Sequence, residues 1–441
     1  MIPENKDSGV SVKKLSVESY KGVRDFYPED MFVQKYIFDR MRKAVEKFGY
    51  VEYGASVLEP AELYRAKSGE EIVNEQTYTF TDRGDREVTL RPEMTPTVAR
   101  MVVAKRRELP FPLRWYSIPN LFRYEKPQRG RMREHWQLNV DLFGSKNIEA
   151  DVEILCVANE VMSSLGAKSG DFEIHINNRK LWNSLCEMWK CTPLQQQKLS
   201  KLVDRKNKIS AKEFEEQGAV ILSSYLPNFI EAMNVTTLEK LEKGARETEG
   251  YKEIVSLIQD LEKRGINNAR FDPTIMRGFD YYTGNIFEVF DANPENRRSL
   301  FGGGRYDDLA ALFEGDKIPA VGFGAGDVTV RDFLETHGLL PAYGSSAQLY
   351  IAVQDETCRD SAEQLSGQLR SQGHNVILDI AHKKLGDQIK TADRQKIPFV
   401  TAVGAEEVKS GAYRIKNLAD GSEKILKADE ISSYLKTQLA L

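Results

Sequence analysis

The densest cluster of cationic side chains in the sequence lies between Arg123 and Arg133. This stretch, RYEKPQRGRMR, carries five basic residues against one acid. Pro127 and Gly130 favour a loop between two strands. Arginine donates hydrogen bonds from a planar fork that matches phosphate oxygens, so this loop could bind a phosphate group. The alternative is a solvated basic loop without a specific ligand, and the loop alone does not decide between the two.

Two glycine-rich segments could let the backbone approach a ligand closely. GGGRYDDL spans residues 302–309, and VGFGAGD spans residues 321–327. Three consecutive glycines place no side chain in the way, and the second segment resembles a glycine turn that opens a helix, where free N–H groups could meet phosphate. The alternatives are a flexible turn for the first segment and tight packing of a helix on a strand for the second.

Two further segments combine charged and hydroxyl side chains. MRGFDYYTG, residues 276–284, places an arginine beside an acid and two tyrosines, and strand alternation would put Arg277, Phe279 and Tyr281 on one face. LRPEMTPTVAR, residues 90–100, carries Glu93 and Thr95 where a helix is expected to begin. The alternatives are an aromatic core strand and a capping turn.

Several other chemistries are disfavoured. The five histidines form no HxxxH or HxH pair and the four cysteines form no CxxC, which argues against a protein-bound metal and against a disulfide framework. The net charge of −4 excludes a protein that coats nucleic acid through an overall basic surface. No GxSxG or Walker A motif occurs. The residues alone therefore indicate an anion- or nucleotide-binding enzyme.

The elements that must position these segments predict two domains of an α+β protein. Residues 1–335 indicate an antiparallel sheet flanked by helices, with an amphipathic helix over 31–48 and a helical insertion at 180–265. A loop at 336–346 is the expected linker. From 347 to 441 strands and helices alternate, which predicts a small α/β domain with a largely parallel sheet.

The sequence also indicates a cellular setting. No apolar run approaches the ~18 residues of a membrane span. The polar N-terminal stretch has no apolar core of the signal-peptide kind, and the few, widely spaced cysteines fit a reducing compartment. We expect a cytoplasmic protein with no membrane contact.

Taken in order, these segments resemble the class II aminoacyl-tRNA synthetases, and specifically the histidyl-tRNA synthetase family. The helix at 31–48 with the strand ending at Pro60 resembles motif 1, which implies a homodimer. LFRYEKPQRGRMREHWQ resembles motif 2, and RGFDYYTG and GGGRYDDL resemble the two histidine-specific signatures. Residues 347–441 resemble the class II anticodon-binding domain, whereas residues 1–335 would form the catalytic domain.

The resemblance implies an ATP-dependent ligation of L-histidine to tRNA(His) through a histidyl-adenylate, with Mg²⁺ present. Attack at the α-phosphate builds negative charge on its non-bridging oxygens, and fixed cations there would stabilise that charge. By resemblance, the catalytic cations are Arg277 and Arg123.

The resemblance also assigns the binding residues. Histidine would be held by Glu93, Thr95 and Gln137 at its ammonium group, by Asp141 and Tyr282 at the two ring nitrogens, and by Tyr306 as a pocket wall. ATP would contact Arg123, Glu125, Arg131, His135 and Thr329. A matched donor and acceptor on an imidazole ring would reject analogues that leave them unpaired, by up to ~10⁴-fold.

Two positions depart from the family pattern. Thr329 stands where motif 3 normally ends in an arginine that stacks on adenine, and His135 stands where motif 2 usually has phenylalanine. Adenine would therefore be held by a variant clamp, or ATP binding would be weakened. The second outcome would fit a non-catalytic paralogue, either the regulatory subunit of ATP phosphoribosyltransferase or a sensor of histidine or uncharged tRNA. That subunit generally lacks the anticodon domain and degrades RGFDYYTG, whereas this sequence keeps both.

Replacing Arg277 by alanine tests the resemblance directly. We expect Arg277→Ala to lower histidine-dependent ATP–pyrophosphate exchange by about 10²–10³-fold, because one fixed cation on the reacting phosphate is lost. Histidine binding, measured on the same protein by calorimetry, should persist. Exchange at the unmodified rate in this variant would contradict the role assigned to Arg277.

Overall fold

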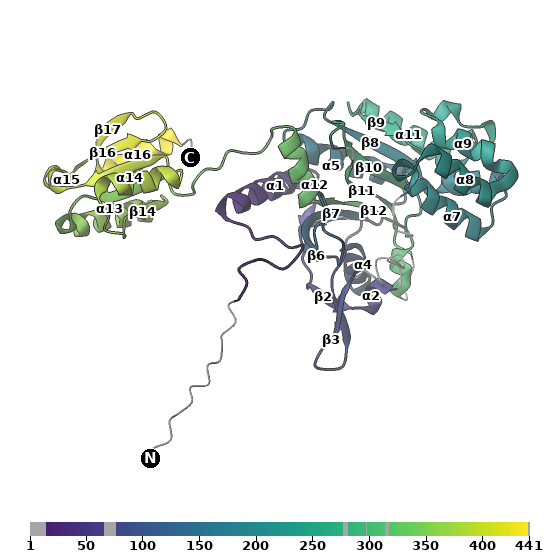
Figure 1. Ribbon diagram of the computed structural model, residues 1–441, viewed down its shortest axis with the longest axis horizontal. Helices are drawn as coiled ribbons and strands as arrows, with labels where there is room; N and C mark the ends of the chain where they lie inside the picture. Colours follow the sequence, from purple (N-terminus) through teal and green to yellow (C-terminus); the bar gives the residue numbers. More distant parts are fainter. Residues whose placement is uncertain (1–14, 66–75, 277–280, 297, 314–316, 440–441) are drawn as a thin grey trace, which may run out of the picture. The chain divides into compact units, whose positions relative to one another are not determined.

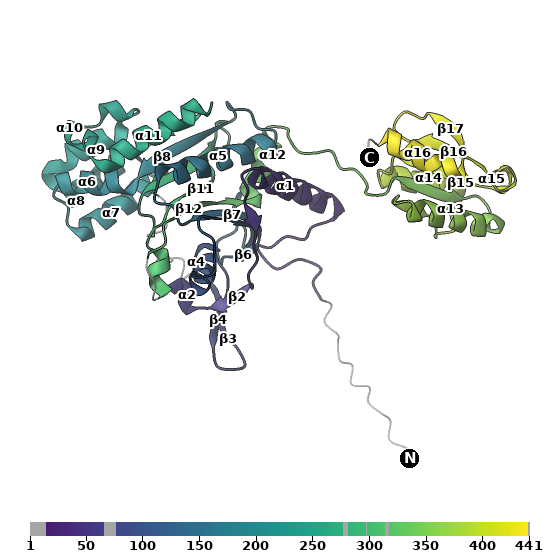
Figure 2. The same ribbon diagram turned by 180° about the vertical axis from the view of Figure 1, so that it is seen from behind.

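A computed structural model describes residues 15–65, 76–276, 281–296, 298–313 and 317–439 (Figures 1 and 2). Contacts divide the chain into two compact units, Met1–Leu340 and Pro341–Leu441. Helix α12 (Asp327–Thr336) is the last helix before this division, and Leu339 and Leu340 still pack against the core of the first unit. Sheets and helices in both units confirm the α+β class.

The first unit is built on a nine-stranded sheet with the order β1-β5-β7-β12-β11-β10-β8-β9, and β6 pairs with β7 beside this path. The inner pairs are antiparallel, as predicted, but the pairs at the two edges, β1–β5 and β8–β9, are parallel. The strands span β1 (Val51–Glu52), β5 (Leu113–Ser117), β6 (Asn120–Phe122), β7 (Glu134–Phe143), β8 (Phe172–Asn178), β9 (Ala269–Phe271), β10 (Asn285–Asp291), β11 (Ser299–Arg305) and β12 (Ala320–Gly326).

Helices cover both faces of this sheet. α1 (Pro28–Glu46) and α5 (Ile148–Ser164) pack together over one face, where the buried side chains Ile37, Met41 and Val45 form the inward stripe of α1. α1 begins with Pro28, whose fixed φ suits the first turn of a helix, so it starts earlier than the predicted 31–48. α4 (Thr95–Ala104) lies on the opposite side of the sheet from α5 (Figures 1 and 2).

A small three-stranded sheet lies beside α4. Its order is β2-β4-β3, with β2 (Leu58–Pro60), β3 (Tyr78–Thr81) and β4 (Glu87–Leu90), and α2 (Glu62–Arg65) follows β2. The β3–β4 hairpin is the one that the sequence predicts, and Asp82 closes its turn by accepting the backbone N–H of Gly84 at 2.8 Å.

Six α-helices fill the stretch between β8 and β9, where the sequence predicts the insertion at 180–265. They pack around large apolar side chains, among them Trp182, Trp189, Phe214 and Phe229. Hydroxyl side chains cap several of them, as in the capping box of Thr192 and Gln195. The helices are α6 (Arg179–Met188), α7 (Pro193–Asp204), α8 (Ala211–Leu222), α9 (Leu226–Asn234), α10 (Lys243–Arg246) and α11 (Glu249–Lys263).

The second unit holds a five-stranded sheet with the order β14-β13-β15-β16-β17. β13 pairs in parallel with β14 and β15, as predicted, but β16 and β17 form an antiparallel hairpin, because the short turn between them leaves no room for a crossover helix. The elements are β13 (Leu349–Val353), α13 (Arg359–Ser371), β14 (Val376–Leu378), α14 (Leu385–Arg394), β15 (Phe399–Val403), α15 (Ala405–Ser410), β16 (Ala412–Asn417), β17 (Glu423–Lys427) and α16 (Ala428–Gln438). Within the described residues, no helix has the length and apolar character that crossing a membrane requires.

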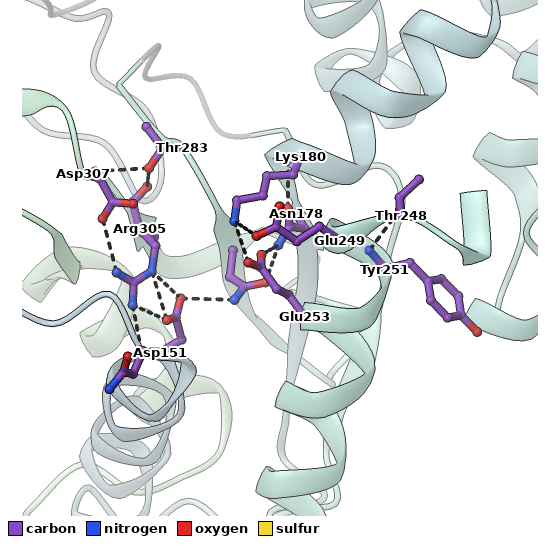
Figure 3. Close-up of polar contacts among 12 residues, drawn as sticks. Asp151, Asn178, Lys180, Thr248, Glu249, Tyr251, Glu253, Thr283, Arg305 and Asp307 are labelled. Atoms are coloured by element: carbon purple, nitrogen blue, oxygen red, sulfur yellow. Dashed lines mark hydrogen bonds and ion pairs between the residues drawn. The ribbon is translucent and has the colours of Figure 1, made fainter. Parts of the chain in front are cut away.

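A buried polar network ties the central strands to the helices of the first unit (Figure 3). Arg305, the last residue of β11, donates through Nε to Asp151 Oδ2 on α5 at 3.0 Å, and their side chains are 7% and 3% exposed. Asp151 also accepts from Asn285 at 3.2 Å, and Asn285 accepts from Asn178 at 2.8 Å. Asn178 donates in turn to Glu253 on α11 at 2.7 Å. The end of β11 is therefore fixed to both α5 and α11.

Removing the Asp151 charge should destabilise the first unit. Asp151→Asn leaves the buried Arg305 guanidinium with only the partly exposed Asp307 as a counter-charge, at 3.2 Å, which costs about 3–5 kcal/mol of unfolding free energy. The matched control is Glu160→Gln, which breaks the exposed pair with Lys47 and should cost less than about 1 kcal/mol. Denaturant unfolding compares the two, and equal losses would contradict a structural role for the buried pair.

Candidate active site

One face of the two central strands is bare backbone over a run of glycines. Alternate residues of β11 and β12 on this face, here called the glycine face, are Gly302, Gly304, Gly322, Gly324 and Gly326. A Cβ at Gly322 would lie 2.5 Å from Asp141 Oδ1, and a Cβ at Gly324 would lie 2.8 Å from the Gln137 side chain. The flexible turn that the sequence leaves open for GGG is wrong, because these glycines lie within strands; Gly326 does precede the first residue of α12, as expected of a glycine that opens a helix.

Strand β7 borders the glycine face with a row of polar side chains. His135, Gln137, Asn139 and Asp141 alternate along β7 and therefore share one face. Gly322 opposes Asp141, and Gly324 opposes Asn139. His135 and Asp141 are six residue steps apart along β7, which corresponds to a length of ~20 Å. The arrangement suits an elongated ligand with a different chemical group at each end.

At the Asp141 end of the row, two carboxylates lie buried among tyrosine rings, a cluster here called the candidate histidine pocket. The Tyr306 hydroxyl donates to Asp141 Oδ1, and the Tyr281 hydroxyl donates to Glu93 Oε2 at 3.2 Å. The ring centroids of Tyr281 and Tyr306 lie 5.9 Å apart, and those of Tyr281 and Tyr282 lie 4.9 Å apart. All five side chains are buried. Two carboxylates among tyrosine rings could recognise a small polar ring that carries a cationic group.

Burial changes the protonation of Asp141. Removal from water raises the pKa of this carboxyl to about 7, although the hydrogen bond from Tyr306 acts in the opposite direction. Asp141 Oδ2 is buried and has no hydrogen-bond partner among the described residues. This oxygen could therefore accept an N–H group from a ligand.

The His135 end of the row is cationic. Arg123 donates through Nε to the carbonyl of Pro92 at 2.9 Å, which holds its side chain next to Glu93. Burial, followed by the charges of Arg123 and Arg24, lowers the pKa of His135 to about 3. A neutral imidazole beside fixed cations suits a flat nucleotide base joined to a phosphate.

The other predicted ATP contacts lie around the loop between β6 and β7. Glu125 and Arg131 are paired at 3.6 Å, and the Arg131 side chain is 58% exposed. Thr329, in the first turn of α12, donates its hydroxyl to the carbonyl of Leu300 at 2.6 Å. A Cβ at Gly130 of the loop would lie 3.6 Å from the Thr329 methyl group. The loop thus reaches α12.

The structure brings most of the predicted site residues together. Glu93, Asp141, Tyr282 and Tyr306 belong to the buried cluster, and Gln137 lies across Gly324. Other predicted residues are less enclosed: Thr95 is half-buried at the start of α4, and Arg131 is exposed. Arg277 lies outside the described residues, so its convergence with Arg123 stays a prediction.

Tyr281 and Tyr282 do not lie in a strand, although the sequence predicts one there. Alternation along a strand was predicted to separate Tyr281 from Tyr282, but both tyrosines precede β10, which begins at Asn285. Their rings contact one another instead, and Tyr282 lies over Gly304. Residues 277–280 themselves lie outside the described residues.

Models of known families match nearly the whole chain. The histidyl-tRNA synthetase model matches residues 22–328, and an anticodon-binding domain model matches residues 348–438. The chain belongs to the histidyl-tRNA synthetase family. It is 41% identical over 437 residues to the histidine–tRNA ligase of Leptospira biflexa, covering 97% of this chain and 99% of that protein. The corresponding ligase of Thermoplasma volcanium is 35% identical, covering 96% and 99%.

Solved structures share the fold of this histidyl-tRNA synthetase chain. Histidyl-tRNA synthetase from Nostoc sp. PCC 7120 matches with a TM-score of 0.83 at 23% identity, covering 96% of this chain and 100% of that one. A protein from Bacillus halodurans C described as an ATP phosphoribosyltransferase regulatory subunit/histidyl-tRNA synthetase matches with a TM-score of 0.74 at 23% identity, covering 89% and 99%. At these identities the likeness shows the fold alone.

An ion pair that lies next to Trp136, near the His135 end of the row, was not identified from this synthetase sequence. Asp327, at the start of α12, accepts from Arg24 at 2.8 Å and from the backbone N–H of Trp136 at 2.9 Å. Asp327 is 4% exposed, so it depends on these donors. The available signal was the acid that ends the apolar segment VGFGAGD, since a buried carboxylate requires a partner.

Stability should depend on pH through Asp141. Between pH 4 and 7 the folded protein keeps a proton that an unfolded chain, with an ordinary carboxyl pKa of 3.8, has lost. Raising the pH therefore lowers the unfolding free energy, by up to ~1.4 kcal/mol per pH unit. Asp141→Asn removes this contribution. The difference in unfolding free energy between the unmodified protein and the variant should change by about 2 kcal/mol between pH 5 and 6.5, and a constant difference would contradict burial of an uncompensated Asp141.

Proposed function

We propose that the site along β7 is where this histidyl-tRNA synthetase joins histidine to ATP before the transfer to tRNA(His). As a member of its family, the chain is an ATP-dependent aminoacyl-tRNA ligase for histidine. The observation that supports the placement is the continuous row from His135 to Asp141. It links a cationic end to a buried polar pocket over the glycine face.

The reaction has two steps. The histidine carboxylate attacks the α-phosphorus of ATP, the bond to pyrophosphate breaks, and a histidyl-adenylate results. A ribose hydroxyl at the tRNA 3′ end then attacks the carbonyl carbon, and AMP leaves. Arg123 is bonded to the carbonyl of Pro92, and its charge acts on His135, so its guanidinium would stabilise negative charge on the α-phosphate together with Arg277.

In this proposal, different residues of the pocket bind different groups of the histidine molecule. Asp141 Oδ2 accepts one ring N–H, and Tyr306 fixes that carboxylate through its other oxygen. Tyr282 takes the second ring nitrogen, while the substrate ammonium meets Glu93. Gln137 and Thr95 complete the ammonium site.

ATP is held at the opposite end. The neutral ring of His135 supplies a flat surface for adenine, and Arg131 reaches the outer phosphates from its exposed position on the loop. Glu125 lies beside Arg131 at the base edge, and Thr329 packs behind the loop.

Mg²⁺ enters with ATP as part of the substrate in this proposal. Among the described residues, no group of three His, Cys, Asp or Glu side chains could hold a metal ion on its own. Mg²⁺ usually binds through nucleotide phosphates and one or two carboxylates.

Two other regions of the chain would bind tRNA and a second subunit. The second unit, which matches the anticodon-binding model, would read the tRNA anticodon. Around α1 and the strand ending at Pro60, the exposed apolar side chains Tyr27, Val51 and Leu58 support a homodimer through this region. The cytoplasmic location stays a prediction from the sequence.

A regulatory or sensor role is the second candidate. The observation in its favour is Thr329, whose hydroxyl is bound to the backbone where the family has an adenine-stacking arginine. The retained pocket side chains and the anticodon-binding unit favour the ligase.

Histidine-dependent ATP–pyrophosphate exchange separates the two candidates. We expect exchange by the unmodified chain, and a loss of about 10²–10³-fold in Arg123→Ala, since a fixed cation leaves the reacting phosphate. The matched control is Arg83→Ala, at the exposed turn of the β3–β4 hairpin, which should exchange normally. No exchange by a correctly folded, histidine-binding chain would favour the sensor.

A further inference from the structure

Three neighbouring strands present hydroxyl and carboxyl side chains on one face at the buried pocket. Trp115 on β5 opposes Asp141 on β7, and Ser117 lies two residues further along β5 on the same face. On the other side of β5, Val51 of β1 opposes Trp115 in a parallel pair. Tyr53 continues this pairing by donating its backbone N–H to the carbonyl of Tyr116 at 2.8 Å. Tyr53, Ser117 and Asp141 therefore share one face of the sheet.

Each of these three side chains holds an unpaired buried oxygen. Tyr53 Oη, Ser117 Oγ and Asp141 Oδ2 are all inaccessible to water and have no hydrogen-bond partner among the described residues. Ser117 and Asp141 are 3% and 4% exposed. Buried polar atoms in native proteins are nearly always paired, so three unpaired oxygens on one face indicate a group that binds there.

The three oxygens are close enough to influence one another. Burial raises the pKa of Tyr53 well above its usual value, the Asp141 charge raises it further, and the Ser117 hydroxyl, which lies close enough for a weak hydrogen-bonding interaction, lowers it. Tyr53 therefore keeps its proton at neutral pH and remains a donor. Its ring packs 5.7 Å from the Trp115 ring and against the cluster that contains Tyr281, Tyr282 and Tyr306.

We propose that Tyr53 and Ser117 are specificity-determining residues of the histidine pocket. Their hydroxyls, with Asp141 Oδ2, form a polar wall that selects a five-membered ring carrying an N–H over rings of the same size without one. The inference rests on the proposed function of the pocket, and it adds two residues that the family signatures do not contain.

The selection follows from counting donors and acceptors. The wall offers two O–H donors and one carboxylate acceptor. An imidazole N–H supplies the donor that Asp141 Oδ2 requires, Tyr282 takes the other ring nitrogen, and the two hydroxyls hold the Asp141 carboxylate in place to receive the N–H group. A thiazole ring supplies no N–H donor and leaves polar atoms unpaired in a buried site. Binding sites reject this kind of mismatch most strongly.

Equilibrium binding to the full chain tests the proposal. Tyr53→Phe and Ser117→Ala each remove one oxygen and keep the carbon framework. Calorimetry measures the affinities for L-histidine and for 3-(4-thiazolyl)alanine. In each variant we expect the affinity ratio of histidine to the analogue to fall about tenfold, through weaker histidine binding, as for the loss of one buried hydrogen bond. In pyrophosphate exchange, KM for histidine should rise while kcat is unchanged.

The matched control is Tyr116→Phe. Tyr116 neighbours Ser117 on β5 but points to the opposite face, where its hydroxyl donates to Glu46 at 2.7 Å. This variant should keep the ratio of the unmodified protein. A purely structural role for Tyr53 and Ser117 would weaken both ligands equally and leave the ratio unchanged, which overturns the inference alone. Absence of histidine binding to the unmodified, folded chain would overturn the inference and the placement of the histidine pocket together.

Discussion

The site depends on a steric constraint at the centre of the sheet. Glycine at alternate positions of β11 and β12 leaves bare backbone where any other residue would project a side chain. Gln137 and Asp141 of β7 occupy part of this space, and a ligand can lie against the remainder. A sheet normally buries both faces by side-chain packing, so an open face of this length has to be encoded residue by residue.

The rest of the first unit holds this open face in place. α1 and α5 cover the reverse side of the sheet with a continuous apolar core. On the site side, α4 and the tyrosines before β10 form a separate apolar cluster. The Arg305–Asp151 pair fixes the end of β11, and Tyr306 follows directly after Arg305. The position of the Tyr306 hydroxyl on Asp141 therefore depends on contacts with helices that do not touch the pocket.

The sequence selects candidate site residues, but it does not give the geometry around them. Glu93 and Tyr306 could be selected because the segments that carry them resemble those of the family. The strand positions of the glycines could not, since GGG is typical of turns unless its partners across the sheet are known. Tyr53 and Ser117 belong to no motif, and only the pairing of β1, β5 and β7 places them beside Asp141.

The second unit shows the same limit in another form. The alternation of strands and helices predicts β13, β14 and β15 correctly, because parallel pairing needs the intervening helices. The final two strands have no helix between them and pair as a hairpin. Connection length, rather than strand composition, decides this difference.

The environment of Asp141 would make amino-acid binding at the proposed site depend on pH. A carboxyl that titrates near neutrality is partly protonated in the free enzyme. A ligand that donates an N–H to this oxygen favours its ionised form, so occupancy of the pocket expels a fraction of a proton into the surrounding water. If the proposed site is correct, histidine binding would release a fraction of a proton, and the binding equilibrium would shift with pH.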